Sequence, residues 1–362
     1  MTQIGNELMQ KSMLLGSVAL AMMAGAISTA DAAVFNTLTG EAPIVIAHRG
    51  ASAYVSENTL ASTELALDMA APYVENDVQM TRDGVLVVMH DGSLERTTNI
   101  ENHFERRNGS YNVADFTLAE IKSLTVDTKI NTDHDFLISG ARAYEVPTFS
   151  EQLDLINAYN AEKGTNYGIL VEGKYGFNAA TNRAVMETLK EKGFDTADKA
   201  LIQSFDFGNV FDYALLKDDL EMDTGIAQLG SATWNGYAWT VNNLISLQNV
   251  AQYTDTVAIS YGSLSKAFID AAHDLGLSVY GWTFRPSDLG AAESMMASYL
   301  TWGLDGFITD NPDLVDAAIG AANRFSTMAL QDAMPSVPVP AGLPLLCTGL
   351  AGLALLRRRR AA

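Results

Sequence analysis

Cysteine is almost absent from this sequence, since the single residue, Cys347, lies close to the C-terminus. No disulfide can form within the chain, so its stability must come from burial of apolar side chains. Basic residues are also scarce, with 23 Lys and Arg against 43 Asp and Glu and a net charge of −20. This charge argues against nucleic acid as a partner, and any phosphate site must be made positive locally.

The first 33 residues have the pattern of a signal peptide. Lys11 precedes an apolar run from Met13 to Ile27, and small residues with A-x-A spacing follow, ending at Ala32 and Ala33. A membrane anchor is the alternative, but the run is shorter than the roughly 20 residues of a spanning helix. We therefore expect cleavage after Ala32 or Ala33 and export to the periplasm, the cell surface or the medium.

Residues 331–362 form a tail with three parts. A Val-Pro segment at 337–341 precedes an apolar run at 342–356, which is closed by four arginines at 357–360. Positive charge marks the cytoplasmic side of a membrane segment. The tail resembles the VPLPA variant of PEP-CTERM sorting signals, which implies transient anchoring and an exosortase-type processing enzyme as a partner. An ordinary tail anchor is the alternative.

Between these ends, residues 34–330, the sequence alternates β-rich apolar segments with amphipathic ones, as repeated βα units do. The eight strand candidates are Ile44–Ala47, Tyr73–Gln79, Gly168–Glu172, Ala200–Ser204, Gly225–Leu229, Thr256–Ser260, Ser278–Thr283 and Gly306–Thr309. Eight such units predict an α/β fold, a (β/α)8 TIM barrel. A doubly wound open sheet is the alternative, but no G-x-G-x-x-G loop follows the first strand.

A ninth strand is expected at Val85–His90, because Asp83-Gly84 between apolar runs is a hairpin signal. Such a hairpin would place His90 roughly opposite Glu75. Residues 92–145 then break the βα pattern and read as a small insertion. Insertions in barrel enzymes commonly lie on the face where the βα loops converge, so this one is expected to shape substrate access.

Carboxylates gather on two of the predicted strands. Glu75 and Asp77 stand at positions i and i+2, so both side chains point to one face of their strand. Like charges this close need a cation unless the strand edge is solvated, and Glu172 offers a third oxygen ligand. Because neither a multi-cysteine nor a paired-histidine motif is present, a divalent cation such as Ca²⁺ or Mg²⁺ is expected rather than zinc.

Two of the five histidines accompany these carboxylates. His48 follows the first strand and precedes Arg49, which can clamp phosphate oxygens, while His90 ends the predicted hairpin. Lys174 adds an ammonium two residues after Glu172. Taken alone, His48 could equally be structural, but two imidazoles beside a metal, Arg and Lys suit attack on a phosphodiester. The histidines at 103, 134 and 273 lack such neighbours.

Five short motifs occur in order along the chain: His48-Arg49-Gly50, Glu57-Asn58-Thr59, Glu75-Asn76-Asp77-Val78 with Thr81 and Asp83-Gly84, His90-Asp91, and Glu172-Gly173-Lys174. Three further segments follow at 203–205, 281–283 and 305–310. Over residues 44–313 the sequence resembles the glycerophosphodiester phosphodiesterase family, including its exported bacterial members. There are two departures: Ser56 stands where many relatives have proline, and Gly173 replaces an apolar residue, which could loosen the spacing of Glu172 and Lys174.

The resemblance implies a (β/α)8 barrel and assigns roles to single residues. His48 and His90 would be the acid–base pair, with the metal held by Glu75, Asp77 and Glu172. Phosphate would be bound by Arg49 and Lys174. Trp282 would face the glycerol or the alcohol side, with ordinary core packing as the alternative.

The expected activity is metal-dependent hydrolysis of glycerophosphodiesters to sn-glycerol 3-phosphate and an alcohol. One alternative is a related barrel phosphodiesterase that acts on intact phospholipid or a lipid-like diester. Another is a surface-displayed binding protein that keeps the fold without the activity. The motifs alone leave the first open, whereas the intact set of catalytic side chains argues against the second.

Overall fold

The computed structural model describes residues 35–126, 144–174 and 176–333. The predicted signal peptide, most of the predicted tail and His134 lie outside these ranges. One compact unit spans Met1–Gly320, and a second, Ala321–Ala362, begins within the last described helix. Within the described part of the chain, every helix falls short of the length and apolarity that a bilayer-spanning segment needs.

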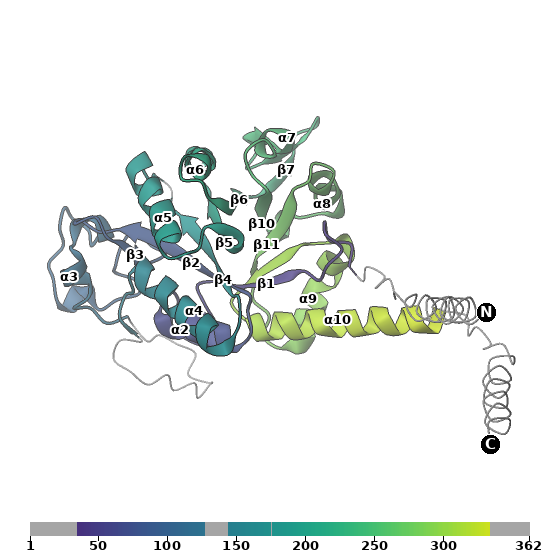
Figure 1. Cartoon of the computed structure of the whole chain (residues 1–362), viewed down its shortest axis with the longest axis horizontal. Helices are drawn as coiled ribbons and strands as arrows, with labels where there is room; N and C mark the ends of the chain where they lie inside the picture. The colour runs from purple at the N-terminus through teal and green to yellow at the C-terminus, as the bar shows by residue number, and fades with distance from the viewer. Residues whose placement is uncertain (1–34, 127–143, 175, 334–362) are drawn as a thin grey trace, which may run out of the picture. The chain divides into compact units, whose positions relative to one another are not determined.

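Eight parallel strands close into a barrel (Figure 1), because β1 pairs with β12 on one side and with β2 on the other. The strands are β1 (Ile44–Ala47), β2 (Tyr73–Met80), β4 (Gly168–Gly173), β5 (Thr196–Ser204), β6 (Asp223–Gly230), β10 (Thr256–Ser260), β11 (Ser278–Phe284) and β12 (Gly306–Thr309). All eight strand candidates and the (β/α)8 barrel are confirmed. The largest difference is at β5, which begins at Thr196 because an exposed, polar stretch extends the strand before its buried part.

A helix follows each barrel strand before the next begins. These helices are α2 (Leu60–Asp68), α4 (Phe149–Lys163), α5 (Ala179–Glu191), α6 (Phe207–Asp219), α7 (Leu247–Val250), α8 (Lys266–His273), α9 (Leu289–Trp302) and α10 (Pro312–Ala333). Inside the barrel, apolar side chains such as Ile46, Leu170 and Ile308 pack together. A larger cluster that includes Val74, Ile169 and Phe149 lies between strands and helices. The strands that carry the site are thus packed on both faces, which makes them rigid.

The predicted hairpin forms, but with a different register. β3 (Leu86–Val88) runs antiparallel to β2, with Val78 opposite Val88. The loop is centred on Asp83, so Met80 pairs with Leu86, and continuing this register would place residue 90 opposite Asn76 rather than Glu75. His90 itself lies just beyond the strand. The register thus differs by one residue from the position expected roughly opposite Glu75, and the side chains of His90 and Glu75 reach the same cavity.

The described part of the insertion has a small core of its own. It contains the short helices η1 (Ile100–Asn102), η2 (Val113–Asp115) and α3 (Leu118–Ile121). Apolar side chains including Leu94, Ile100 and Phe116 pack with Val87 and Met89 of the hairpin. The insertion is thus attached to the segment that ends at His90. Its predicted outer limits, 92–145, stay a prediction.

A second small sheet follows β6. Its strands β7 (Ala232–Trp234), β8 (Trp239–Val241) and β9 (Ile245–Ser246) are antiparallel. This sheet was not predicted, because its strands are only two or three residues long.

Candidate active site

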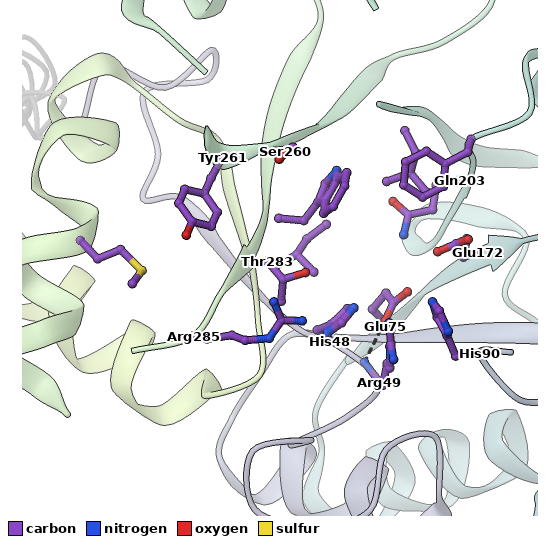
Figure 2. A pocket seen from close by; sticks show the side chains of 15 residues that line it. His48, Arg49, Glu75, His90, Glu172, Gln203, Ser260, Tyr261, Thr283 and Arg285 are labelled. Atoms are coloured by element: carbon purple, nitrogen blue, oxygen red, sulfur yellow. Dashed lines mark hydrogen bonds between the residues drawn. The ribbon is translucent and has the colours of Figure 1, made fainter. Parts of the chain in front are cut away.

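A cavity of about 420 Å³ opens at the carboxyl ends of the barrel strands. Six of the eight residues predicted to act in the site line it: His48, Arg49, Glu75, His90, Glu172 and Trp282. Figure 2 shows Glu75 between the rings of His48 and His90, with Tyr261 and Ser260 on the far side of the cavity. Asp77 and Lys174 lie behind the lining residues, where Lys174 contacts both Asp77 and Glu172.

The three predicted metal ligands meet because of strand register. Glu75 and Asp77 project from the same face of β2, and Glu172 on β4 is the direct register partner of Asp77. One carboxylate oxygen from each of the three lies within 4.8 Å of the others. Oxygens on opposite sides of a cation with bonds of about 2.4 Å are about 4.8 Å apart, so the spacing suits a hard divalent ion.

Basic side chains only partly balance this acidic cluster. Lys174 Nζ lies 2.5 Å from Asp77 and 2.7 Å from Glu172. Arg49 Nε lies 3.4 Å from Asp77, and the Arg49 backbone N–H donates to Glu75 at 2.8 Å. Two cations therefore face three buried carboxylates, which leaves a net negative charge where little solvent can compensate it.

The pKa values of the carboxylates reflect this imbalance. Burial, together with repulsion from Asp77, raises the pKa of Glu75 well above its usual range and that of Glu172 to about 7. Burial also acts to raise the pKa of Asp77, but attraction by Lys174 and Arg49 outweighs it and lowers that pKa. A divalent cation would offset the excess negative charge, so the residues present fit a metal.

The loop after β1 is shaped to bring Arg49 to this cluster. Arg49 adopts a left-handed φ of 57°, and a Cβ on Gly50 would lie 2.5 Å from Ser62, so only glycine fits there. Asn58 donates to Asp77 at 2.8 Å, and Thr59 caps the N-terminus of α2. The Glu57-Asn58-Thr59 motif thus supports the acidic cluster and starts the helix behind it.

Each of the two predicted catalytic histidines is backed by an aspartate and an arginine. His48 Nδ1 lies 2.6 Å from Asp310, which accepts from Arg285 Nε at 2.5 Å. Attraction by the ring holds the pKa of Asp310 below its usual value although burial acts to raise it. An ionised Asp310 requires the proton on Nδ1, which leaves Nε2 of His48 free to act in the cavity.

The second histidine has the same arrangement with residues of other elements. His90 Nδ1 lies 2.5 Å from Asp91, which accepts from Arg96 Nε at 2.5 Å. Arg96, in the insertion, also donates to Glu57 at 2.6 Å, and Glu57 in turn accepts from Arg49. Arg96 and His90 together hold the pKa of Asp91 at about 2, against the effect of burial. Arg96 of the insertion therefore orients the His90 imidazole through Asp91. Through Glu57 it also orients Arg49, which is predicted to bind phosphate.

The opposite wall of the cavity is aromatic. The Trp282 ring meets Phe205 edge-on with centroids 5.5 Å apart, and its Nε1 donates to the carbonyl of Ala258 at 2.9 Å. Trp282 therefore lines the cavity rather than being wholly absorbed in the core, and this wall suits an apolar or weakly polar part of a ligand.

Several contributing residues were not assigned roles from the sequence. Asp310 and Glu57 belong to quoted motifs, but their partners could not be read from spacing, since Asp310 and His48 are 262 residues apart. Arg96 and Arg285 carried no local signal. His273 instead pairs with Asp305, before β12 at the other end of the barrel, which agrees with its exclusion from the site.

The two departures from the family pattern have structural explanations. Gly173 keeps its register opposite Val78, and a Cβ there would lie 2.0 Å from the Tyr213 hydroxyl. Tyr213 thus fills the space, and the expected loosening of Glu172 and Lys174 is not seen. Ser56 is buried and its carbonyl accepts from Thr59 at 2.8 Å, so the loop is held without a proline.

The fold and this cavity place the chain among the (β/α)8 barrel enzymes. More narrowly, it belongs to the glycerophosphoryl diester phosphodiesterase family, whose model matches residues 48–314.

Individual relatives agree with this assignment. The chain is 33% identical over 224 residues to a glycerophosphodiester phosphodiesterase of Haemophilus influenzae, covering 55% of this chain and only 59% of that protein. It is 29% identical over 283 residues to one of Bacillus subtilis, covering 77% and 87%.

Solved structures show the same fold. An Oleispira antarctica phosphodiesterase in complex with the product sn-glycerol-3-phosphate has a TM-score of 0.59 at 24% identity, covering 79% of this chain and 100% of that one. A glycerophosphodiester phosphodiesterase of Agrobacterium tumefaciens gives a TM-score of 0.53 at 21% identity, covering 76% and 99%.

Proposed function

We propose that the protein hydrolyses glycerophosphodiesters to sn-glycerol 3-phosphate and an alcohol. The observation that carries this proposal is the convergence of two aspartate-backed imidazoles, His48 and His90, with three buried carboxylates on one cavity. Membership of the family supports the substrate class, and the structure of the Oleispira antarctica phosphodiesterase is in complex with the proposed product.

Glu75, Asp77 and Glu172 would hold a divalent cation, Ca²⁺ or Mg²⁺. When bound, the cation would neutralise negative charge on the phosphoryl oxygens. Lys174 lies between Asp77 and Glu172, and its ammonium group would bind an oxygen of the substrate phosphate beside the metal ligands. Arg49, held by Glu57 at 2.9 Å, would bind a second phosphate oxygen.

His48 and His90 would share the proton transfers. Nε2 of the neutral ring would accept the proton of the attacking nucleophile, while the other ring, protonated on both nitrogens, would give its Nε2 proton to the leaving alkoxide. Asp310 and Asp91 fix the Nδ1 protons, so that both rings present Nε2 to the cavity. The aromatic wall of Phe205 and Trp282 would accommodate the glycerol or alcohol side.

Export and processing are part of the proposal on sequence grounds alone. The pattern of residues 1–33 supports a cleaved signal peptide, and the tail of 331–362 supports transient anchoring and cutting by an exosortase-type enzyme. Mass spectrometry of protein from the native host tests both: a mature chain that keeps residues 1–33 would exclude the signal peptide.

A substrate profile tests the activity. The full chain is assayed for sn-glycerol 3-phosphate release from glycerophosphodiesters with different headgroups, with Ca²⁺ and Mg²⁺ in turn, beside intact phospholipid. Release from the deacylated diesters is the expected result. Turnover of intact phospholipid alone would select the related lipid phosphodiesterase, and an inert protein with every diester and metal would indicate the displayed binding protein.

A further inference from the structure

We infer that the small sheet of β7, β8 and β9 is a docking element for the surface of a zwitterionic phospholipid bilayer, and that it turns the catalytic cavity toward that surface. The hairpin formed by β7 and β8 carries two exposed aromatic residues near its tip, Trp234 and Tyr237, with exposed fractions of 54% and 93%. A tyrosine this exposed contributes nothing to the packing of the barrel. Its exposed ring is therefore available to contact a partner outside the molecule.

The tip is built to hold these rings out from the barrel. The Asn235 side chain accepts from the backbone N–H groups of Tyr237 and Ala238, each at 3.0 Å, and so closes the turn. Trp234 pairs across the strands with Trp239, their centroids 5.5 Å apart. Trp239 in turn packs edge-on against Phe268 of α8, also at 5.5 Å. The inner tryptophan thus anchors the hairpin, and the outer rings are presented in a preformed arrangement.

The hairpin belongs to the end of the barrel that holds the cavity. It begins directly after the carboxyl end of β6, and Figure 1 shows β7 next to α7. At its base, the Ala232 N–H donates to Ser263 Oγ at 3.0 Å, in the short helix η4 (Tyr261–Ser263), and Tyr261 lines the cavity. Among the described residues, the other large aromatics with exposed rings, Phe205 and Phe211, follow the carboxyl end of the neighbouring strand β5.

Charge distinguishes a bilayer from other occupants. Residues 224–254 contain no Asp, Glu, Lys, Arg or His, although the chain as a whole carries a net charge of −20. Burying this element in a bilayer interface therefore desolvates no charged side chain. Tryptophan and tyrosine favour that interface, where one end of the ring is apolar and the other meets water. The acidic remainder of the protein would be repelled by an anionic membrane, so a zwitterionic surface is the better match.

Tryptophan fluorescence can report contact of the barrel with lipid without a signal from the terminal segments. All four tryptophans lie between residues 234 and 302, so the apolar segments near both termini contain none. The full chain is mixed with phosphatidylcholine vesicles whose acyl chains are brominated, because bromine quenches a nearby indole. The readout needs no substrate, so a failure here is distinct from a failure of the proposed hydrolysis.

The test variant is Tyr237→Asp, which places a charge at the tip and keeps all four tryptophans. Its matched control is Leu275→Asp, at a 37% exposed leucine just before β11 at the opposite end of the barrel. The wild-type chain and the control are expected to be quenched equally. For Tyr237→Asp, the lipid concentration that gives half-maximal quenching should be at least roughly tenfold higher, equivalent to about 1.4 kcal/mol. Its turnover of a soluble diester should stay unchanged.

Four results would overturn the inference. They are no quenching of the wild-type chain, equal quenching of Tyr237→Asp, stronger quenching by brominated phosphatidylglycerol than by phosphatidylcholine at low salt, and self-association that Tyr237→Asp abolishes in the absence of vesicles. The last result would assign the tip to a second copy of this chain. Quenching that is strong with phosphatidylcholine, weaker with phosphatidylglycerol and lost in Tyr237→Asp would establish the docking element.

Discussion

Nδ1 of His48, on the loop after the first barrel strand, lies 2.6 Å from Oδ1 of Asp310, directly after the last. This contact joins the ends of the paired strands β1 and β12, so Asp310 can orient the imidazole only in the closed barrel. Arg285 holds the other carboxylate oxygen of Asp310. The same His–Asp–Arg pattern recurs at His90, Asp91 and Arg96, so both rings are oriented by an ionised carboxylate.

Replacement of Asp310 by asparagine should impair turnover without unfolding the barrel. An amide can donate to Nδ1 and thereby stabilise the tautomer that lacks a free Nε2 acceptor. Because acid–base catalysis contributes about 10²–10⁴-fold, we expect kcat to fall by about 10²-fold or more. The kcat of Arg285→Lys, which keeps a positive charge beside Asp310, should fall less. A kcat for Asp310→Asn within twofold of the wild type would remove this pairing from the mechanism.

Removal of the second imidazole tests the other half of the pair. His90→Ala should lower kcat by about 10²–10⁴-fold, the usual contribution of a positioned acid or base. The His90 side chain is 35% exposed, so little packing is lost and the thermal midpoint should stay close to that of the wild type. His103→Ala, at a histidine outside the cavity, serves as the control. Retained turnover of glycerophosphocholine by His90→Ala would exclude His90 as a catalyst.

The acid limb of the pH profile should lie below the ordinary histidine range. Burial lowers the pKa values of both His48 and His90 from 6.5, so both rings stay neutral to a lower pH than a free imidazole. The imidazole that acts as base then loses its neutral form only below pH 6.5. A profile of kcat/KM against pH will show this as the acid limb. An acid-limb midpoint above 6.5 would contradict the burial effect.

Stability should depend on pH in the same direction. Where the folded pKa lies below 6.5, the unfolded chain binds more protons, so the histidine contribution is complete above 6.5 and is lost as the pH falls. Unfolding of the wild type and of His48→Gln in urea, compared at pH 5.5 and 7.5, separates this contribution from that of the carboxylates. A wild type no more sensitive to acid than His48→Gln would count against it.

Gly173 and Tyr213 form a size-matched pair that urea unfolding can test. In Gly173→Ala the new Cβ would lie 2.0 Å from the Tyr213 hydroxyl, so the ring must move. Overpacking of this kind costs about 1–3 kcal/mol of unfolding free energy. Among the described residues the Tyr213 hydroxyl has no hydrogen-bond partner, so Tyr213→Phe alone should be mild and should partly rescue Gly173→Ala. Unaltered stability of Gly173→Ala would show that the space is not limiting.

The barrel was predictable because its parallel strands are short, apolar and evenly separated by helical segments. The metal-type cluster was predictable in part: side-chain alternation puts Glu75 beside Asp77, but only the β2–β4 register brings in Glu172. Hydrogen bonds across the closed barrel, such as Asp310 to His48, leave no trace in local spacing. The exposed hairpin at Trp234 and Tyr237 was missed because its strands are too short to show a period of two.

Hydrolysis by this protein is proposed to require one cation, held by Glu75, Asp77 and Glu172. One titration tests it: Ca²⁺ or Mg²⁺ is added to chelator-treated full chain while bound metal and released sn-glycerol 3-phosphate are measured in the same samples. Turnover should rise in proportion to occupancy of one site per chain, and the Asp77→Asn and Glu172→Gln variants should lose binding and turnover together. Full turnover by the metal-free protein, or unchanged metal binding in both variants, would contradict it.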